Sequence, residues 1–228
     1  MIKLELVNKS FNGIKVISNI SFHVNTGEAV ALVGPSGGGK TTVLRLIAGF
    51  EVPDSGKITI GDRLVSEKGY ACSPHERGIG MVFQKPALWP HMTLAQNIRF
   101  GLKGMSKAET KGRLEELFLL THLNGLEERF PHQVSGGEAQ RATLARAIAP
   151  KPDILFLDEP MMGFDQDLIV EMTAVLRKLR DETRTTIIYV SHDFSEVQAV
   201  TDRVILLSHG KISYDGLWDG LDVGRSLR

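Results

Sequence analysis

The most constraining feature of this sequence is a glycine-rich loop that directly follows a short apolar segment. Residues Glu28–Val33 read as a strand and run straight into Gly34–Thr41, whose sequence is Gly-Pro-Ser-Gly-Gly-Gly-Lys-Thr. The apolar stretch Thr42–Ala48 behind the loop has the character of a helix. This order of strand, loop and helix fits the pattern G-x-x-x-x-G-K-[ST], which holds the phosphates of a nucleoside triphosphate. The sequence therefore predicts a nucleotide-binding loop.

The residue types in this loop suit the chemistry of phosphate binding. Glycines let the backbone wrap so that its N–H groups point inward, and the start of the following helix adds a favourable dipole for an anion. The Lys40 side chain can reach the β- and γ-phosphates, and the Thr41 hydroxyl can be a ligand of Mg²⁺. The residues predicted to contact ATP here are Gly34, Pro35, Ser36, Gly37, Gly38, Gly39, Lys40, Thr41 and Thr42.

Composition narrows the remaining possibilities. The 228 residues carry 27 basic and 27 acidic side chains, so the formal net charge is zero and provides no general attraction for nucleic acid. Cys72 is the single cysteine, which excludes an internal disulfide framework. The first residues lack the architecture of a signal peptide, and no apolar run approaches the roughly 20 residues of a membrane span. We therefore expect a soluble chain that reaches any membrane through a partner.

Periodicity and turn signals predict strands first, then helices, then an alternation of the two. Helical spacing dominates residues 93–149, where Ser106 and Ser135 each begin a capping box. Strands are expected at residues 2–8, 20–24, 57–60, 79–83, 154–157, 185–190 and 203–207, and helices also at 167–182 and 194–200. No element is assigned to residues 61–78 or 218–228. This order predicts an α/β fold with a doubly wound, mostly parallel sheet.

Two adjacent carboxylates close the apolar strand that begins at Ile154. Ligands of an open α/β sheet lie outside the carboxyl ends of its parallel strands, so Asp158 should face the phosphate loop and hold Mg²⁺, directly or through water. Glu159, one position further on, is predicted to polarise an attacking water as a general base. A solvated turn carrying two acids is the alternative, and the phosphate loop elsewhere in the chain makes it the weaker interpretation.

A second glycine turn opens one of the predicted helices. Its residues Ser135, Gly136, Gly137 and Glu138 leave bare N–H groups at a helix start, where the dipole favours an anion. Because the chain already has its own phosphate loop, we interpret these residues as contacts to the ATP of another subunit. A capping box with glycines that only give the loop flexibility is the alternative.

At this point the chain resembles, over its whole length, the ATP-binding subunits of ATP-binding cassette (ABC) transporters. Three segments carry the resemblance: the Walker A loop at 34–41, the signature motif at 134–140 and the Walker B strand at 154–158. Four single residues also match the family: Phe11 resembles its stacking aromatic, Gln84 its Q-loop glutamine, Asp165 its D-loop aspartate and His192 its switch histidine. Core packing for Phe11 and His192, and an ordinary surface position for Gln84, are the alternatives. The D-loop departs from the usual Ser-Ala-Leu-Asp by reading Met162-Gly163-Phe164-Asp165, and the signature carries Val134 and Glu138 where Leu and Gln are frequent.

The resemblance implies a fold, a reaction and a set of ligands. It implies a P-loop NTPase core with an antiparallel β subdomain, formed by residues 1–84 and 151–228, and an inserted helical subdomain at 85–150. It also implies ATP hydrolysis with Glu159, His192, Lys40 and Gln84 as the catalytic residues. Mg²⁺ would be held by Thr41, Gln84 and Asp158, and Phe11 would stack on the adenine. Two copies would pair head to tail around two MgATP, with residues 135–138 of each contacting the ATP of the other.

The resemblance also implies a partner and a location. Residues 77–97 look most like those of bacterial importer ATPases for iron(III), polyamines, sulfate or sugars. This resemblance implies that the chain works with a transmembrane permease and a solute-binding protein. It also implies a cytoplasmic position at the inner face of the cell membrane. Exporters or lipid-extraction ATPases are an alternative, and soluble ABC ATPases acting on nucleic acid or ribosomes are a weaker one. We expect the stretch Pro86–Pro90, with Met92 and Leu94 nearby, to line a groove for a short helix of the permease. The alternative is that Leu88 and Trp89 pack in the core of the helical subdomain.

Overall fold

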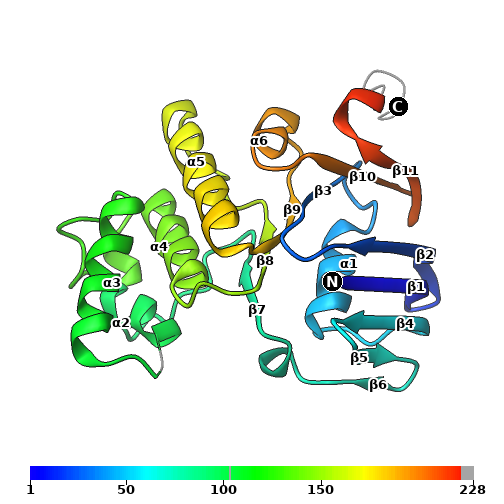
Figure 1. The fold of residues 1–228 in the computed structure, drawn as a ribbon, viewed down its shortest axis with the longest axis horizontal. Helices are drawn as coiled ribbons and strands as arrows, with labels where there is room; N and C mark the ends of the chain where they lie inside the picture. The colour runs from blue at the N-terminus through cyan, green and yellow to red at the C-terminus, as the bar shows by residue number, and fades with distance from the viewer. Residues whose placement is uncertain (103, 222–228) are drawn as a thin grey trace.

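The computed structural model describes residues 1–102 and 104–221 and contains two sheets (Figure 1). The larger sheet has the strand order β11-β10-β3-β9-β8-β7, and its neighbours are parallel except for the antiparallel pair β10–β11. Its strands are β3 (Ala29–Val33), β7 (Ile79–Val82), β8 (Ile154–Asp158), β9 (Thr186–Val190), β10 (Arg203–Ser208) and β11 (Lys211–Leu217). The α/β prediction with a mostly parallel sheet is confirmed.

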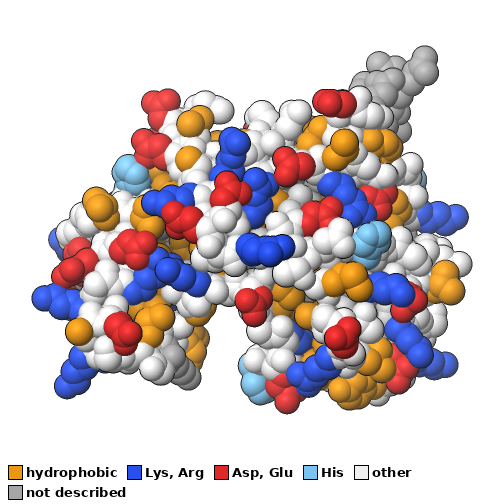
Figure 2. Space-filling model, in the orientation of Figure 1, with side chains coloured by type: hydrophobic (Ala, Val, Ile, Leu, Met, Phe, Trp, Pro, Cys, Tyr) orange, Lys and Arg blue, Asp and Glu red, His pale blue; other side chains and the backbone are white. Residues whose placement is uncertain are grey.

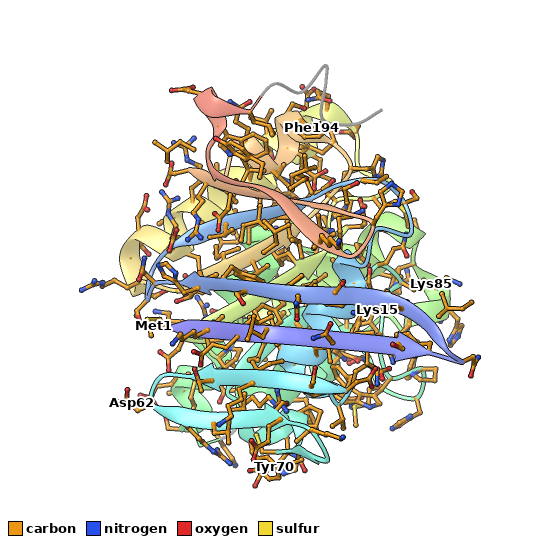
Figure 3. All side chains as sticks on the ribbon, turned by 90° about the vertical axis from the view of Figure 1, so that its right-hand side faces the viewer. Met1, Lys15, Asp62, Tyr70, Lys85 and Phe194 are labelled. Atoms are coloured by element: carbon orange, nitrogen blue, oxygen red, sulfur yellow. The ribbon has the colours of Figure 1, made fainter. Side chains whose placement is uncertain are left out.

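The smaller sheet is antiparallel and has the order β2-β1-β4-β5-β6. Figure 3 shows this sheet face on, with Met1 and Asp62 at one end and Lys15 at the other. Its strands are β1 (Ile2–Phe11), β2 (Ile14–Val24), β4 (Ser55–Ile60), β5 (Arg63–Glu67) and β6 (Tyr70–Ala71).

Alternate residues of the parallel strands belong to two different cores, because successive side chains of a strand point to opposite faces. In β3, Val30 and Leu32 pack with helix α1 (Lys40–Ala48) and the antiparallel sheet, whereas Ala31 packs with the remaining helices. The same alternation separates Phe156 from Leu157 in β8. The parallel sheet is therefore covered on both faces, as its continuous apolar strands require.

Capping side chains define several helix starts. Ser106 and Ser135 each accept a hydrogen bond from the backbone N–H three residues on, and the glutamate at that position bonds back, which confirms both predicted capping boxes. The helices are α1 (Lys40–Ala48), α2 (Leu94–Arg99), α3 (Lys107–Leu120), α4 (Gly136–Ile148), α5 (Gln166–Thr183) and α6 (Phe194–Gln198), with 3₁₀ turns at Pro74–Glu76, Phe100–Leu102, Pro131–Gln133 and Trp218–Gly220. Figure 1 shows α2, α3 and α4 gathered at the side away from the antiparallel sheet.

Three strands lie where the sequence analysis assigned none. β5 and β6 fall within 61–78, and β11 follows the last predicted strand. β11 is an edge strand whose residues alternate between exposed and partly buried, and β6 has only two residues, so neither carries an apolar run. Of the unassigned tail, residues 222–228 lie outside the described residues.

A buried arginine ties α1 to the antiparallel sheet. Arg77 is 5% exposed, and its guanidinium donates to the carbonyl oxygens of Leu46 and Ile47 at the end of α1. It also donates to Val65 O and to the Ser66 hydroxyl on β5, and to Cys72 O. The last carbonyls of a helix have no partner within the helix, so this side chain supplies hydrogen-bond donors to the buried end of α1.

The surface mixes charges of both signs. Figure 2 shows Lys, Arg, Asp and Glu interspersed over the visible face, with a notch at its lower edge between the helical part and the β subdomain. Among the described residues, no helix is both long enough and apolar enough to cross a bilayer.

Candidate functional site

The phosphate loop leaves the carboxyl end of β3 and closes against the end of β10. A Cβ atom on Gly34, which has φ +144°, would lie 2.0 Å from the carbonyl oxygen of Leu207. One on Gly39, with φ +101°, would lie 2.6 Å from the Ile17 Cδ1 atom. Only glycine fits at these two positions, so the loop curves tightly and leads into α1 at Lys40. A cavity of about 220 Å³ lies beside it, lined by Val16, Gly37, Gly38, Gly39, Lys40, Thr41 and Thr42.

Lys40 folds back over its own loop. Its ammonium donates to the carbonyl oxygens of Gly34 at 2.8 Å and Pro35 at 3.0 Å. Burial lowers the pKa of Lys40, and the negative charges of Glu159 and Asp158 oppose that change. The Lys40 ammonium thus lies at the phosphate loop, where it is attracted by the negative charges of Asp158 and Glu159.

Thr41 and Asp158 face each other as predicted. The Thr41 hydroxyl lies 3.4 Å from Oδ1 of Asp158, which is 5% exposed at the end of β8. Burial raises the pKa of Asp158, and the hydrogen bond from Thr41 opposes that shift. A hydroxyl and a carboxylate are the hard oxygen ligands that Mg²⁺ takes when phosphate and water complete its octahedron. The donor set therefore fits the predicted ion.

Glu159 and His192 meet at the next position along the same rim. Asp158 is paired with Val190 across β8 and β9, so the residues that follow these strands are neighbours. Oε2 of Glu159 lies 2.9 Å from Nδ1 of His192 and 3.3 Å from the Ser191 hydroxyl. The hydrogen bond with Glu159 raises the pKa of the His192 imidazole. The backbone of Glu159 is left-handed, with φ +52°, and strain of this kind concentrates at functional sites.

Gln84 and Phe11 lie at the margins of this rim. Gln84 follows β7, whose neighbour in the sheet is β8, and its side chain is exposed. Figure 3 shows Lys85, the next residue, toward the same end of the molecule as Lys15. Phe11 ends β1 and is 36% exposed, with the Lys9 ammonium 5.0 Å from its ring centroid. The exposure of Phe11 argues against core packing, whereas the exposure of Gln84 agrees both with a movable loop and with an ordinary surface position.

The glycine turn at the start of α4 is separate from the phosphate loop. Ser135 and Glu138 bond to each other, and within the described ranges none of their hydrogen bonds reaches residues 34–42. A Cβ atom on Gly137 would come within 3.8 Å of the carbonyl oxygen of Gly163. The structure therefore brings together residues of 34–42, Asp158, Glu159 and His192, and leaves the turn at 135–138 apart from them.

Comparison with known proteins agrees with this geometry. A family profile described as ABC transporter matches residues 17–162. The chain belongs to the ABC transporter family. It is 43% identical over 224 residues to a protein named sulfate/thiosulfate import ATP-binding protein CysA 1 from Agrobacterium fabrum, covering 96% of this chain and 64% of that protein. The Fe(3+) ions import ATP-binding protein FbpC 2 of Pectobacterium atrosepticum is 43% identical over 217 residues, covering 95% and 62%.

Solved structures show the same fold. The dimeric post-hydrolysis state of the ATP-binding cassette MJ0796, bound to ADP and Pi, superposes with a TM-score of 0.86 at 29% identity, covering 97% of this chain and 100% of that one. The protein cbiO1 from Clostridium perfringens, described as part of the ABC transporter complex cbiONQ, gives a TM-score of 0.81 at 26% identity, covering 95% of this chain and 88% of that one. The chain thus has the P-loop NTPase fold of an ABC cassette, and it spans a little under two thirds of the length of the curated relatives named above.

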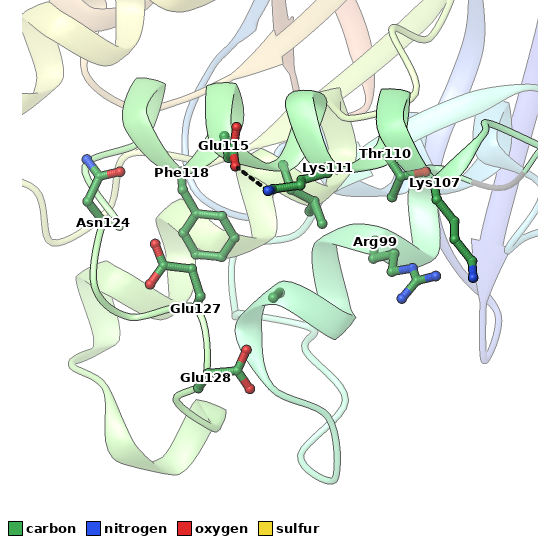
Figure 4. A pocket seen from close by; sticks show the side chains of 11 residues that line it. Arg99, Lys107, Thr110, Lys111, Glu115, Phe118, Asn124, Glu127 and Glu128 are labelled. Carbon is green, nitrogen blue, oxygen red and sulfur yellow. Dashed lines mark ion pairs between the residues drawn. The ribbon is translucent and has the colours of Figure 1, made fainter.

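The prediction that Pro86–Pro90, with Met92 and Leu94, lines a groove is partly wrong. Leu94 is fully buried, because it is the first residue of α2 and faces the core, so it cannot line an open surface. Leu88 packs against the same core, and the Trp89 ring lies 4.4 Å from that of Phe100 and 4.6 Å below the Arg146 guanidinium. An open cavity of about 630 Å³ lies instead between α2 and α3 (Figure 4).

The sequence analysis missed a polar network behind His192. Glu196 on α6 is 7% exposed and accepts hydrogen bonds from the Tyr189 and Ser191 hydroxyls. A signal was present, since a glutamate in the short apolar stretch Phe194–Val200 falls on the helix face that must be buried. The sequence analysis placed Gln140 only at the end of the signature motif, yet its side-chain N–H₂ donates to Phe83 O, next to Gln84.

Proposed function

We propose that this chain is the ATP-hydrolysing subunit of a transporter, most similar to bacterial importers, and that it works as a pair around two MgATP. The convergence of Lys40, Asp158 and Glu159 at the carboxyl rim of β3 and β8 carries the proposal. In this cluster Lys40 and its loop would bind the phosphates, Asp158 would bind the metal ion, and Glu159 would act as the base. The importer names of the relatives support transport as the purpose.

The geometry suggests how hydrolysis proceeds. The triphosphate takes the place of the loop carbonyls at the Lys40 ammonium, which then neutralises the β- and γ-phosphates. Thr41 and Asp158 would hold Mg²⁺, whose charge stabilises the oxygens around the reacting phosphorus. Phe11 supplies a ring face for the adenine.

Glu159 takes the water proton in this scheme. Its Oε2 atom is engaged by His192 and Ser191, while in the described parts of the chain no hydrogen bond of the protein occupies Oε1. Oε1 is free to accept the proton as the water oxygen bonds to the γ-phosphorus and the bond to the bridging β–γ oxygen breaks. His192 holds the carboxylate in place, and Gln84 orients the water or the ion from its loop beside β8.

We expect Lys40→Ala to weaken ATP binding by at least tenfold, because it removes the charge-assisted contacts to the phosphates. Binding of a fluorescent ATP analogue to the purified chain, and release of inorganic phosphate, measure the two steps. Lys57→Ala, an exposed lysine on β4, is the matched control. Parent-level ATP affinity in Lys40→Ala, or no phosphate release by the parent, would contradict the proposed function.

The permease is proposed to dock at the cavity between α2 and α3. Its apolar lining comes from Ala95, Leu114 and Phe118. Figure 4 shows Arg99 and Lys107 at one end and Glu127 and Glu128 at the other, so a helix with the opposite charge at each end would match it. Residues 85–150 would then act as a subdomain that links the permease to Gln84, through the Gln140 bond to Phe83 O. A solute-binding protein outside the membrane would complete an importer.

Reversing the basic end of this cavity with Arg99→Glu and Lys107→Glu is expected to abolish association with the permease, while the ATP affinity of the isolated chain stays unchanged. The association is measured by copurification from detergent-solubilised membranes, with the permease identified by mass spectrometry as a protein of several membrane spans. The matched control reverses two exposed lysines of the β subdomain, Lys57→Glu with Lys68→Glu. Equal copurification of the parent and the Arg99/Lys107 variant would place the permease elsewhere.

A further inference from the structure

Behind the proposed base lies a second carboxylate, which the hydrolysis scheme does not use. Glu196 occupies the middle of α6 and is 7% exposed. Its Oε1 accepts from the hydroxyl of Tyr189, which is fully buried in β9, and its Oε2 accepts from the hydroxyl of Ser191 at 3.1 Å. A buried glutamate is costly unless it is paired, so the two donors offset a substantial desolvation penalty.

Ser191 lies between two carboxylates. Its Oγ atom is 3.1 Å from Oε2 of Glu196 and 3.3 Å from Oε2 of Glu159, and it accepts from the backbone N–H of Asp193 at 3.1 Å. A serine hydroxyl has a single proton, so it can donate fully to one carboxylate only. The residue is 1% exposed, which leaves little room for water to supply a second donor.

The position of this proton matters for Glu159. When Ser191 donates to Glu159, it competes with the His192 imidazole for the same oxygen, Oε2, and weakens the contact that orients the Glu159 carboxylate. When Ser191 donates to Glu196, the charge of Glu159 is left for His192 and for the proton of water.

We propose that Glu196 is a positioning residue, which holds the Ser191 proton away from Glu159 and thereby leaves Oε2 of Glu159 to His192, so that the carboxylate stays oriented for the reaction. This inference rests on the proposed function, because it assigns a role to Glu196 in the same reaction. Tyr189 supports the arrangement by donating to the other oxygen of Glu196 and so fixing the direction of its carboxylate. Burial raises the pKa of Glu196, the Tyr189 and Ser191 hydrogen bonds oppose that change, and the charges of Glu159 and Asp193 add to it.

Glu196→Gln tests this role with little change of shape. The introduced amide keeps an oxygen for Tyr189 but presents an N–H₂ group to Ser191, so the serine proton turns toward Glu159. We expect kcat for ATP hydrolysis to fall about tenfold, the scale of a hydrogen bond to a charged group, with the KM for ATP unchanged. In the nucleotide-free protein, the imidazole nitrogen signals of His192 are expected to move toward those of the neutral ring.

The decisive comparison is the double variant. In a Ser191→Ala background no proton is shared, so adding Glu196→Gln should leave kcat unchanged, and the His192 signals should move only by the smaller amount that loss of the Glu196 charge itself causes. If Glu196 serves only to anchor α6, Glu196→Gln will act equally in both backgrounds, and the inference fails. Glu182→Gln, on the exposed face of α5, is the matched control for loss of one negative charge.

Two further measurements keep the test decisive. Tyr189→Phe leaves Ser191 as donor to Glu196, so a loss of kcat equal to that of Glu196→Gln would also overturn the inference. If Glu196→Gln unfolds, Glu196→Asp takes its place with the same expected results, because its shorter side chain withdraws the carboxylate from Ser191. The His192 signals are read without ATP. If the parent fails to hydrolyse ATP, the proposed function is wrong, whereas an active parent with unmoved His192 signals in Glu196→Gln contradicts only the role of Glu196.

Discussion

Glu159→Gln is expected to lower ATP turnover by ~10²–10⁴-fold while MgATP still binds, because loss of a general base costs that much and the phosphate contacts remain. The amide keeps the shape of the side chain, so it can still bond to His192 and Ser191, yet it cannot accept a proton from water. Single-turnover release of inorganic phosphate and equilibrium ATP binding, measured on the same preparation, separate the two effects.

Two controls make this result specific. Lys40→Ala is expected to lose binding first, which is the opposite pattern, and Glu182→Gln on the exposed face of α5 should behave as the parent. Phosphate release at the parent rate by Glu159→Gln would show that another group takes the proton, and the assignment of the base would be wrong.

ATP is expected to convert Glu159→Gln from monomer to dimer. The glycine turn at Ser135–Gly137 presents N–H groups at a helix start, but its own hydrogen bonds do not reach the phosphate loop of the same chain. A head-to-tail pair lets this turn meet the γ-phosphate held by the other copy. Association then depends on the nucleotide, which bridges the two surfaces, and slow hydrolysis preserves the bridge.

Light scattering with and without MgATP, over a range of protein concentrations, measures this assembly. Adding Lys40→Ala to Glu159→Gln should prevent it, since the bridging nucleotide is lost. Dilution should dissociate the dimer unless ATP is saturating. A monomer under both conditions at high protein concentration would contradict the shared site, and a dimer that ignores ATP would show that the contact does not need the ligand.

Local sequence patterns were sufficient for the central part of the site. The phosphate loop is a contiguous segment, and its glycines, lysine and threonine act through a short stretch of backbone, so the order of residue types already specifies the chemistry. The capping boxes at Ser106 and Ser135 are local in the same sense. Because parallel strands end at a common rim, an apolar strand followed by Asp158 was enough to predict that this carboxylate faces Thr41.

Contacts between distant segments were decided only by the tertiary structure. Arg77 gives no sign in the sequence that it will close the end of α1, and Leu94 follows a proline-rich stretch that suggested an open groove, although it is buried in the core. The edge strand β11 has no apolar run, so its pairing with β10 supplies the order that its sequence lacks.

The network of Tyr189, Ser191 and Glu196 illustrates the difference most clearly. The apolar strand β9 and the position of His192 could be read from the sequence, because both depend on a periodic pattern along one segment. The Ser191 hydroxyl lies within reach of two carboxylates only because β8, β9 and α6 converge there. Hydrogen-bond distance is a property of packed elements rather than of sequence spacing, so the sequence determined which groups the site contains and the fold decided which of them share a proton.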